Sequence, residues 1–278
     1  MSSRFVVTGG TGFVGSHLIQ RLLDQGDVLA ISRSLIGVKH PRLTDLRADL
    51  ASVIPDSRAF RGATVIHCAA VMASTDRSAL WTGNVEGTWN MLEWAIRHEA
   101  RHFVLFSSGG VYGYAKDRPW SETDPTNPIG FYGHTKLIAE NLARAFHDTA
   151  NLAVTVIRLF FPYGEGQKRG IFRLISDAVQ KGTALTANRG GAPRINPIHI
   201  GDVVSAAEML LALPAGYRIF NLCGDEAVSF LDLVHRYEAK YDKKAVLKSS
   251  DLDHDDLLGS NRLLKERTGW LPIQRLAA

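Results

Sequence analysis

The chain has 278 residues, of which 45% are hydrophobic and 22% charged, which allows one large core or a main domain with a smaller second one. Its net charge is +4, and it has no long basic run or aromatic-basic array, so nucleic acid is excluded as a partner. No stretch approaches the roughly 20 apolar residues of a membrane span and no secretory leader is visible, so we expect a cytoplasmic protein.

The first predicted element is a strand that runs directly into a glycine-rich turn. The apolar residues 5–7 precede Gly9, Gly12 and Gly15, and an amphipathic helix is expected at 16–25. Glycine permits the tight turn, lets the backbone approach a pyrophosphate and lets the helix pack closely on its strand. The helix N-terminus adds free N–H groups and partial positive charge, so the sequence predicts a dinucleotide site.

Short apolar runs alternate with helix-length amphipathic segments along the first half of the chain. This alternation is typical of a parallel sheet with helices on both faces, and right-handed crossovers then predict a doubly wound, Rossmann-type α/β fold. The expected strands are 5–8, 28–32, 64–68, 103–107 and 154–159, and the later helices are 84–98 and 132–148.

After about residue 160 glycine and proline become frequent, which indicates a smaller, loop-rich α/β lobe that binds substrate. We therefore expect an NAD(P)-binding domain at 1–160 and a substrate lobe at 161–278 that is interleaved with it. The expected elements of the second lobe are helices at 202–213 and 229–240 and a short strand at 220–222.

Several polar residues are assigned structural roles. Asp202 is expected to cap a helix, and His199 to be a buried hydrogen-bonding residue. His67 and Cys68 are expected only to end a strand. The chain's two cysteines, Cys68 and Cys223, form no disulfide framework or metal-ligand spacing, so we expect a reduced setting and no metal.

Tyr132 and Lys136 are the strongest candidates for chemistry. They stand four apart on an expected helix and share one face, so the ammonium is expected to lower the pKa of the phenol. Ser107 and Ser108 stand at the end of a central strand, where side chains point into the crevice that binds ligands in open α/β sheets. One of these hydroxyls can orient a reacting oxygen toward Tyr132, which then exchanges a proton with a carbonyl or hydroxyl.

Four motifs together resemble the extended short-chain dehydrogenase/reductase family, in its NAD(P)-dependent epimerase/dehydratase branch. They are the glycine triplet, the segment 84–88 (Asn-Val-Glu-Gly-Thr), the strand end 107–113 (Ser-Ser-Gly-Gly-Val-Tyr-Gly) and Tyr132-x-x-x-Lys136. The resemblance covers residues 4–165 firmly and continues more faintly to the ending 269–272 (Gly-Trp-Leu-Pro).

The resemblance implies roles for individual residues. Tyr132 becomes the proton donor or acceptor, Ser108 the hydrogen-bonding partner of the substrate oxygen, and Lys136 the residue that holds the nicotinamide ribose. Asn84 is expected to brace the helix near the site. The other implied cofactor contacts are Gly9, Gly12, Phe13, Val14, Asp49, Leu50, Ala69, Ala70, Ser107 and Pro162. Relatives often pair helices like 84–98 and 132–148 across a dimer, so a homodimer is implied.

The end of the second expected strand decides the cofactor preference. An NAD site usually has a carboxylate there, whereas an Arg accepts a 2′-phosphate. This chain has Ser32 and Arg33 and no acid, which favours NADP(H) over NAD(H). The alternative is that Arg33 stacks on the adenine while either cofactor binds.

The substrate side departs from the family pattern. Phe161 stands where relatives have an asparagine, and Arg194 matches one phosphate-binding arginine, but the stretch 248–253 lacks a second. These departures favour an NADPH-dependent reductase of a sugar-like or small ketone. The alternatives are a nucleotide-sugar 4-epimerase or dehydratase and a cofactor-sensing protein without catalysis, which the intact Ser108, Tyr132 and Lys136 argue against.

Overall fold

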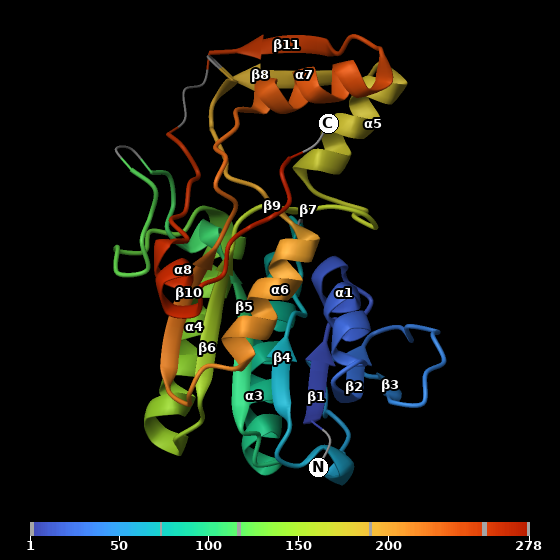
Figure 1. The fold of residues 1–278 in the computed structure, drawn as a ribbon, viewed down its shortest axis with the longest axis vertical. Helices are drawn as coiled ribbons and strands as arrows, with labels where there is room; N and C mark the ends of the chain where they lie inside the picture. Colours follow the sequence, from blue (N-terminus) through green and yellow to red (C-terminus); the bar gives the residue numbers. More distant parts are fainter. Residues whose placement is uncertain (1–2, 73, 116–117, 189–190, 252–254, 277–278) are drawn as a thin grey trace.

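The computed structural model describes residues 3–72, 74–115, 118–188, 191–251 and 255–276. Its centre is a seven-stranded, fully parallel sheet of order β10-β6-β5-β4-β1-β2-β3 (Figure 1). The strands are β1 (Ser3–Thr8), β2 (Gly26–Ser32), β3 (Leu43–Arg47), β4 (Thr64–His67), β5 (His102–Ser108), β6 (Val154–Leu159) and β10 (Tyr217–Leu222). The order reverses between β1 and β4, which is where open α/β sheets bind ligands.

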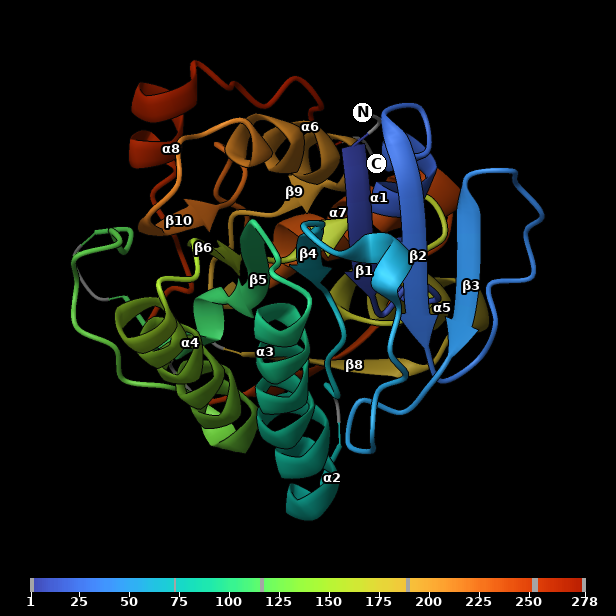
Figure 2. The ribbon, with the colours of Figure 1, turned by 90° about the horizontal axis from the view of Figure 1, so that it is seen from below.

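Helices cover both faces of this sheet, as the predicted doubly wound fold requires. On one face α1 (Phe13–Leu22) packs on α6 (Ile200–Leu211), and α8 (Arg262–Thr268) lies beside β10. On the other face lie α2 (Arg77–Trp81), the π-helical turn η2 (Thr82–Glu86), α3 (Gly87–Arg97) and α4 (Gly130–Ala150). Figure 2 shows α3 and α4 on the opposite side of the strands from α6 and α8. Each layer buries its own apolar cluster against the sheet.

A smaller lobe sits beyond the carboxyl ends of the strands (Figure 1). Its two-stranded parallel sheet, β8 (Ala184–Asn188) and β11 (Val246–Ser250), accompanies the packed helices α5 (Ile171–Lys181) and α7 (Phe230–Tyr241). The elements α5, β8 and α7 share a separate apolar core. The short strands β7 (Pro162–Tyr163) and β9 (Ile198–His199) pair between the lobes. A smaller α/β lobe is thus present as predicted, and its role in binding substrate stays a prediction.

The C-terminal segment ties the two lobes together. After α8, the indole N–H of Trp270 donates to Ser205 on α6 at 3.0 Å. The backbone N–H groups of Ile273 and Gln274 then donate to the two carboxylate oxygens of Asp202, at 3.1 and 3.0 Å. Asp202 therefore anchors this segment and is not the predicted helix cap. The cap of α6 is His199, whose ring accepts the N–H of Gly201.

The remaining differences from prediction concern the order of the later elements and the elements β3 and α5. β10 and α6 follow residue 160 but belong to the main sheet and its helix layer, so the chain returns to the first domain after entering the small lobe. The exact division at 160 stays a prediction. β3 and α5 were not predicted, because β3 is mostly half-exposed and α5 follows a glycine-rich loop. None of the described helices is long and apolar enough to cross a membrane.

Candidate functional site

The glycine turn joins β1 to α1 with little room for side chains. Gly9 adopts φ +71°, and a Cβ there would lie 2.8 Å from the backbone of Ala69. Gly12 donates its N–H to the Gly9 carbonyl at 2.8 Å, and a Cβ on Gly15 would collide with that same carbonyl. Gly9 and Gly15 therefore have a steric reason to be glycine, whereas at Gly12 a Cβ would lie 3.0 Å from the Gly9 carbonyl oxygen.

This turn places the N-terminus of α1 at the carboxyl edge of the sheet. Gly12 is the N-cap of α1, and no side chain in the described chain caps it. The first N–H groups of the helix, beginning at Phe13 and Val14, are therefore available to an anionic group. The geometry of the turn is compatible with a dinucleotide pyrophosphate, and its contact with a cofactor stays a prediction.

The end of β2 carries the residues that were expected to select the cofactor. Ser32 is buried, and its hydroxyl has no hydrogen-bond partner among the described residues. Arg33 follows it at the surface, where its carbonyl accepts a bond from Arg47. Sequence reasoning missed Asp45 on β3, whose Oδ2 accepts the Ile36 N–H at 2.7 Å and whose Oδ1 is buried and unpartnered in the described region. These orphaned oxygens fit polar groups of a bound nucleotide.

The other predicted cofactor residues have different surroundings. Ala69 and Ala70 follow β4, and the backbone of Ala69 approaches Gly9 of the glycine turn. Asp49 is exposed and accepts the N–H of Ala51, whereas Leu50 is buried in the core. Pro162 is half-buried at the start of β7. Ser107 points elsewhere: its hydroxyl donates to Glu140 Oε1 at 2.5 Å.

Ser108, Tyr132 and Lys136 come together at the carboxyl end of β5. The Ser108 hydroxyl accepts the N–H of Gly110 at 3.1 Å and forms a hydrogen bond with Tyr132. Tyr132 lies in the first turn of α4, and Lys136 follows one turn later with only 1% of its surface exposed. The structure thus assembles the three predicted catalytic side chains.

The expected effect of Lys136 on the pKa of Tyr132 is wrong for the protein alone. Burial raises the pKa of the Tyr132 phenol to about 12, and the hydrogen bond from Ser108 only partly opposes this. Burial also lowers the pKa of Lys136 to about 8, against the opposing effects of Glu140 and Cys68. Loss of hydration is therefore the largest cause of both shifts, and it moves the pKa of Tyr132 against the direction that the spacing suggested.

A buried polar network joins β1, β4 and the start of α3. The Thr88 hydroxyl donates to the Asn84 carbonyl at 2.6 Å, so its oxygen accepts from His67 Nε2 at 3.0 Å. His67 Nδ1 then accepts the Thr8 hydroxyl at 2.8 Å. His67 is thus a fixed neutral imidazole and does more than end a strand.

Asn84 extends this network to the catalytic helix. Its side chain pairs with both backbone groups of Val71, and its amide donates to Thr135 at 3.0 Å. Thr135 in turn donates to the Tyr132 carbonyl. Asn84 lies in the π-helical turn η2, a distortion that is frequent at functional sites. The contacts agree with the predicted bracing role.

The predicted substrate residue Phe161 lies at the small lobe. A cavity of about 160 Å³ there is lined mostly by apolar side chains, including Phe161, Pro193, Ile195 and Phe230. Phe161 adopts φ +43°, which is unusual for a residue with a bulky side chain.

Arg194 lies on the exposed rim beside this cavity. Its Nε and Nη2 donate to Asp256 Oδ2 at 3.0 and 2.5 Å, and its backbone N–H donates to Asp256 Oδ1. The predicted phosphate-binding arginine is therefore already paired with a carboxylate. Of the stretch 248–253, residues 252 and 253 lie outside the described residues.

A family model supplies the decisive comparison. The model of the NAD-dependent epimerase/dehydratase family matches residues 5–223, from β1 to just past β10. The chain belongs to this family. The predicted resemblance to extended short-chain dehydrogenases/reductases is confirmed.

Individual family members are similar over most of their length. A putative UDP-glucose 4-epimerase from Methanocaldococcus jannaschii is 29% identical over 86% of this chain and 85% of its own. A dTDP-glucose 4,6-dehydratase from Streptomyces griseus is 30% identical over 84% of this chain and 77% of its own. The solved structure of MoeE5 with UDP-glucuronic acid and NAD has a TM-score of 0.88 and 27% identity, and covers 98% of this chain and 95% of its own.

His67 gives this family member a specific dependence of stability on pH. Its pKa is lowered to about 3 because it is fully buried, whereas an unfolded histidine titrates near 6.5. The unfolded chain therefore binds more protons below pH 6.5, and stability falls as pH falls. We expect the titration of His67 to make the free energy of unfolding about 2 kcal/mol smaller at pH 5 than at pH 7.5.

Denaturant titration from pH 7.5 to 4.5 measures this loss. His67→Gln should flatten the pH dependence relative to the native chain, although His102, whose pKa is also lowered, leaves a residual slope. The exposed His134→Gln is the matched control and should keep the native slope. An unchanged slope in His67→Gln would show that the pKa of His67 in the fold is close to its unfolded value, and would contradict this prediction.

Proposed function

We propose that this chain is a nucleotide-sugar 4-epimerase, which oxidises a ring hydroxyl and returns the hydride to the opposite face of the same carbon. Support comes from the family membership and from the names of the similar proteins, several of which are nucleotide-sugar epimerases. The observation that carries the proposal is the assembly of Ser108, Tyr132 and Lys136 beside the glycine turn. This replaces reduction of a free ketone as the leading function.

The chain's own residues supply the acid–base part of this reaction. Tyr132 accepts the hydroxyl proton as the carbonyl forms and gives it back when the carbonyl is reduced. Ser108 holds the reacting oxygen beside the phenol. Lys136 stabilises the phenolate and binds the ribose. A bound nicotinamide supplies the hydride acceptor, and the glycine turn and the orphaned Ser32 hydroxyl are the groups that would hold its nucleotide.

Epimerisation is favoured over dehydration by the residues that follow Ser108. Elimination of water needs an additional acid and base next to the oxidised carbon. Ser108 is followed by Gly109 and Gly110, which carry no ionisable side chain. An epimerase needs only the proton exchange at Tyr132, so these glycines are compatible with it.

The small lobe would hold the nucleotide part of the substrate. The apolar cavity beside Phe161 and Phe230 suits a planar base, and Arg194 on its rim suits a phosphate. Phosphate binding would require Arg194 to exchange its carboxylate partner Asp256. The pair is exposed, so this exchange costs little.

Replacement of Tyr132 tests the proposed reaction. Tyr132→Phe should lower kcat by about 10²–10⁴-fold, because the acid–base group is lost while binding is kept. The assay follows C4 inversion of UDP-glucose, UDP-glucuronate and dTDP-glucose by NMR. Tyr241→Phe removes a phenol hydroxyl whose partner is Ser176 in the small lobe, and should retain activity. Inversion that survives Tyr132→Phe would refute the assignment.

A second candidate, an NADPH-dependent reductase, is favoured by Ser32 and Arg33. These side chains suit a 2′-phosphate, and β2 ends without a carboxylate. The proposed epimerase regenerates its cofactor in each turnover, so denaturation of the purified protein should release about one oxidised nicotinamide nucleotide per chain. Chromatography of the released nucleotide identifies it.

The opposite outcome would support the reductase. It would be an empty protein that binds NADPH much more tightly than NADH, with the preference lost in Arg33→Ala. Retained preference in Arg33→Ala would remove the reason for the NADP(H) assignment.

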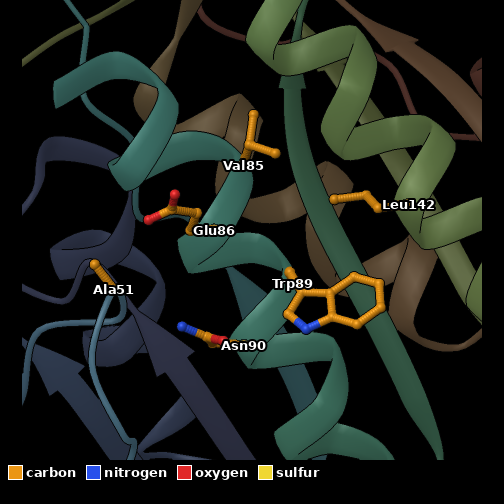
Figure 3. Close-up of a pocket in the computed structure, with 6 residues that line it drawn as sticks. All are labelled: Ala51, Val85, Glu86, Trp89, Asn90 and Leu142. Atoms are coloured by element: carbon orange, nitrogen blue, oxygen red, sulfur yellow. The ribbon is translucent and has the colours of Figure 1, made fainter. Parts of the chain in front are cut away.

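We also propose a homodimer through α3 and α4. A surface cavity of about 370 Å³ lies between these helices. Figure 3 shows Val85 and Trp89 on the side toward Leu142, and Glu86 and Asn90 on the side toward Ala51. Trp89 is 46% exposed although it packs edge-on against Phe146. A large exposed aromatic beside an apolar groove is typical of an interface between proteins.

A charge at the centre of this surface should separate the subunits. Trp89→Glu should convert a dimer into a monomer in sedimentation velocity, because burying the carboxylate would be unfavourable. Leu174→Glu is the matched control, since Leu174 is 58% exposed on α5 of the small lobe. A native chain that sediments as a monomer would refute the proposal.

A further inference from the structure

A buried polar row crosses three strands just before the catalytic edge of the sheet. Ser107 on β5 stands directly opposite Arg158 on β6, and Arg158 stands opposite Asn221 on β10. The three residues are 6%, 4% and 0% exposed. Ser108 follows this row by one residue, so the row lies immediately below the candidate catalytic serine.

Glu140 of α4 bonds two residues of this row, Ser107 and Arg158. Its carboxylate accepts the Ser107 hydroxyl at 2.5 Å and the Nη2 and Nε of Arg158 at 2.7 and 3.1 Å. Glu140 is only 2% exposed. The register of β5 and β6 explains this convergence, because directly opposite residues of neighbouring strands point to the same face.

Helical spacing places Glu140 next to the catalytic residues. Tyr132, Lys136 and Glu140 follow one another at intervals of four, so they share one face of α4. Lys136 therefore lies between the candidate acid–base residue and a buried carboxylate.

The other titratable groups that act on Lys136 come from β4 and the residue after it. The His67 imidazole is neutral, because burial lowers its pKa to about 3. The Cys68 thiol is also neutral, because burial raises its pKa. Among the described groups that act on Lys136, Glu140 is thus the anion that favours its charged form.

We propose that Glu140 is a positioning residue for Lys136: its carboxylate keeps the buried ammonium charged beside Tyr132, while Ser107 and Arg158 hold that carboxylate in place. The inference rests on the role proposed above for Lys136. It assigns Ser107 to the support of the site, where the sequence had placed it at the cofactor.

A purely stabilising role for the ion pair explains less of the geometry. Buried ion pairs are weak sources of stability, because desolvation offsets the attraction. This pair is also incomplete, since Arg158 Nη1 is buried without a hydrogen-bond partner among the described residues. The desolvation cost of burying this ion pair is understandable if the carboxylate also stabilises the charged form of Lys136.

Glu140→Gln in the full-length protein tests the proposal. The Cε resonance of Lys136, assigned by its loss in Lys136→Met, reports the protonation of the amine across a pH titration. Loss of the carboxylate removes a favourable interaction of the charged amine, so the midpoint should fall by about one pH unit. The alkaline limb of the kcat profile should move in the same direction.

Asp148→Asn is the matched control, because it removes a carboxylate from the same helix at an exposed pair with Arg144. It should leave the Lys136 midpoint unchanged. If Glu140→Gln fails to fold because Arg158 is left unpaired, Glu140→Gln with Arg158→Met removes both charges, and the midpoint should still fall. An unmoved midpoint in a folded variant overturns the proposal.

The two readouts separate this inference from the proposed function. The Lys136 resonance is measured without substrate or cofactor, so it tests Glu140 even if no nucleotide sugar is converted. If the native chain is an epimerase but the Lys136 midpoint is the same in Glu140→Gln as in the native chain, only the positioning role of Glu140 is refuted.

Discussion

The parallel pairing of β1, β4 and β5 is the constraint on which the candidate site depends. Because the three strands are neighbours and run the same way, the glycine turn after β1 and Ser108 at the end of β5 meet at one edge. Asn84 then connects the backbone after β4 to α4, which carries Tyr132 and Lys136. A change in strand order would leave every motif intact and would separate the cofactor turn from the chemistry.

The sequence predicted those parts of the site that are encoded in local spacing. The glycine triplet and the Tyr132–Lys136 pair each span a single turn or helix, so their geometry follows from backbone periodicity. The contacts of Ser107 with Glu140 and of Arg194 with Asp256 join residues 33 and 62 positions apart. No pattern in the sequence specifies such pairs, because they depend on strand register and on the docking of the small lobe.

The pKa of Tyr132 shows a second kind of limit. Spacing placed Lys136 on the same face of the helix as Tyr132, but the sign of the pKa shift depends on how much water each group loses when the chain folds. Tyr132 and Lys136 both lose much of their hydration. The pKa of Tyr132 is therefore raised and the pKa of Lys136 is lowered, and both shifts favour the neutral form of the side chain. A phenol in this setting needs further positive charge or hydrogen bonds before it can serve as a base near neutral pH, so the buried carboxylate behind Lys136 matters to the chemistry.

The candidate site has a buried ion pair next to the catalytic residues and a more exposed one at its rim. At the chemical end, Glu140 and Arg158 are almost fully buried, so separating them would leave an uncompensated charge in the core, at a cost of about 3–5 kcal/mol. At the rim, Arg194 is 58% exposed, and exposed pairs of this kind contribute about 0–1 kcal/mol. Under the proposed function, a substrate phosphate therefore displaces Asp256 from Arg194 at little cost, whereas the buried pair of Glu140 and Arg158 stays fixed through turnover.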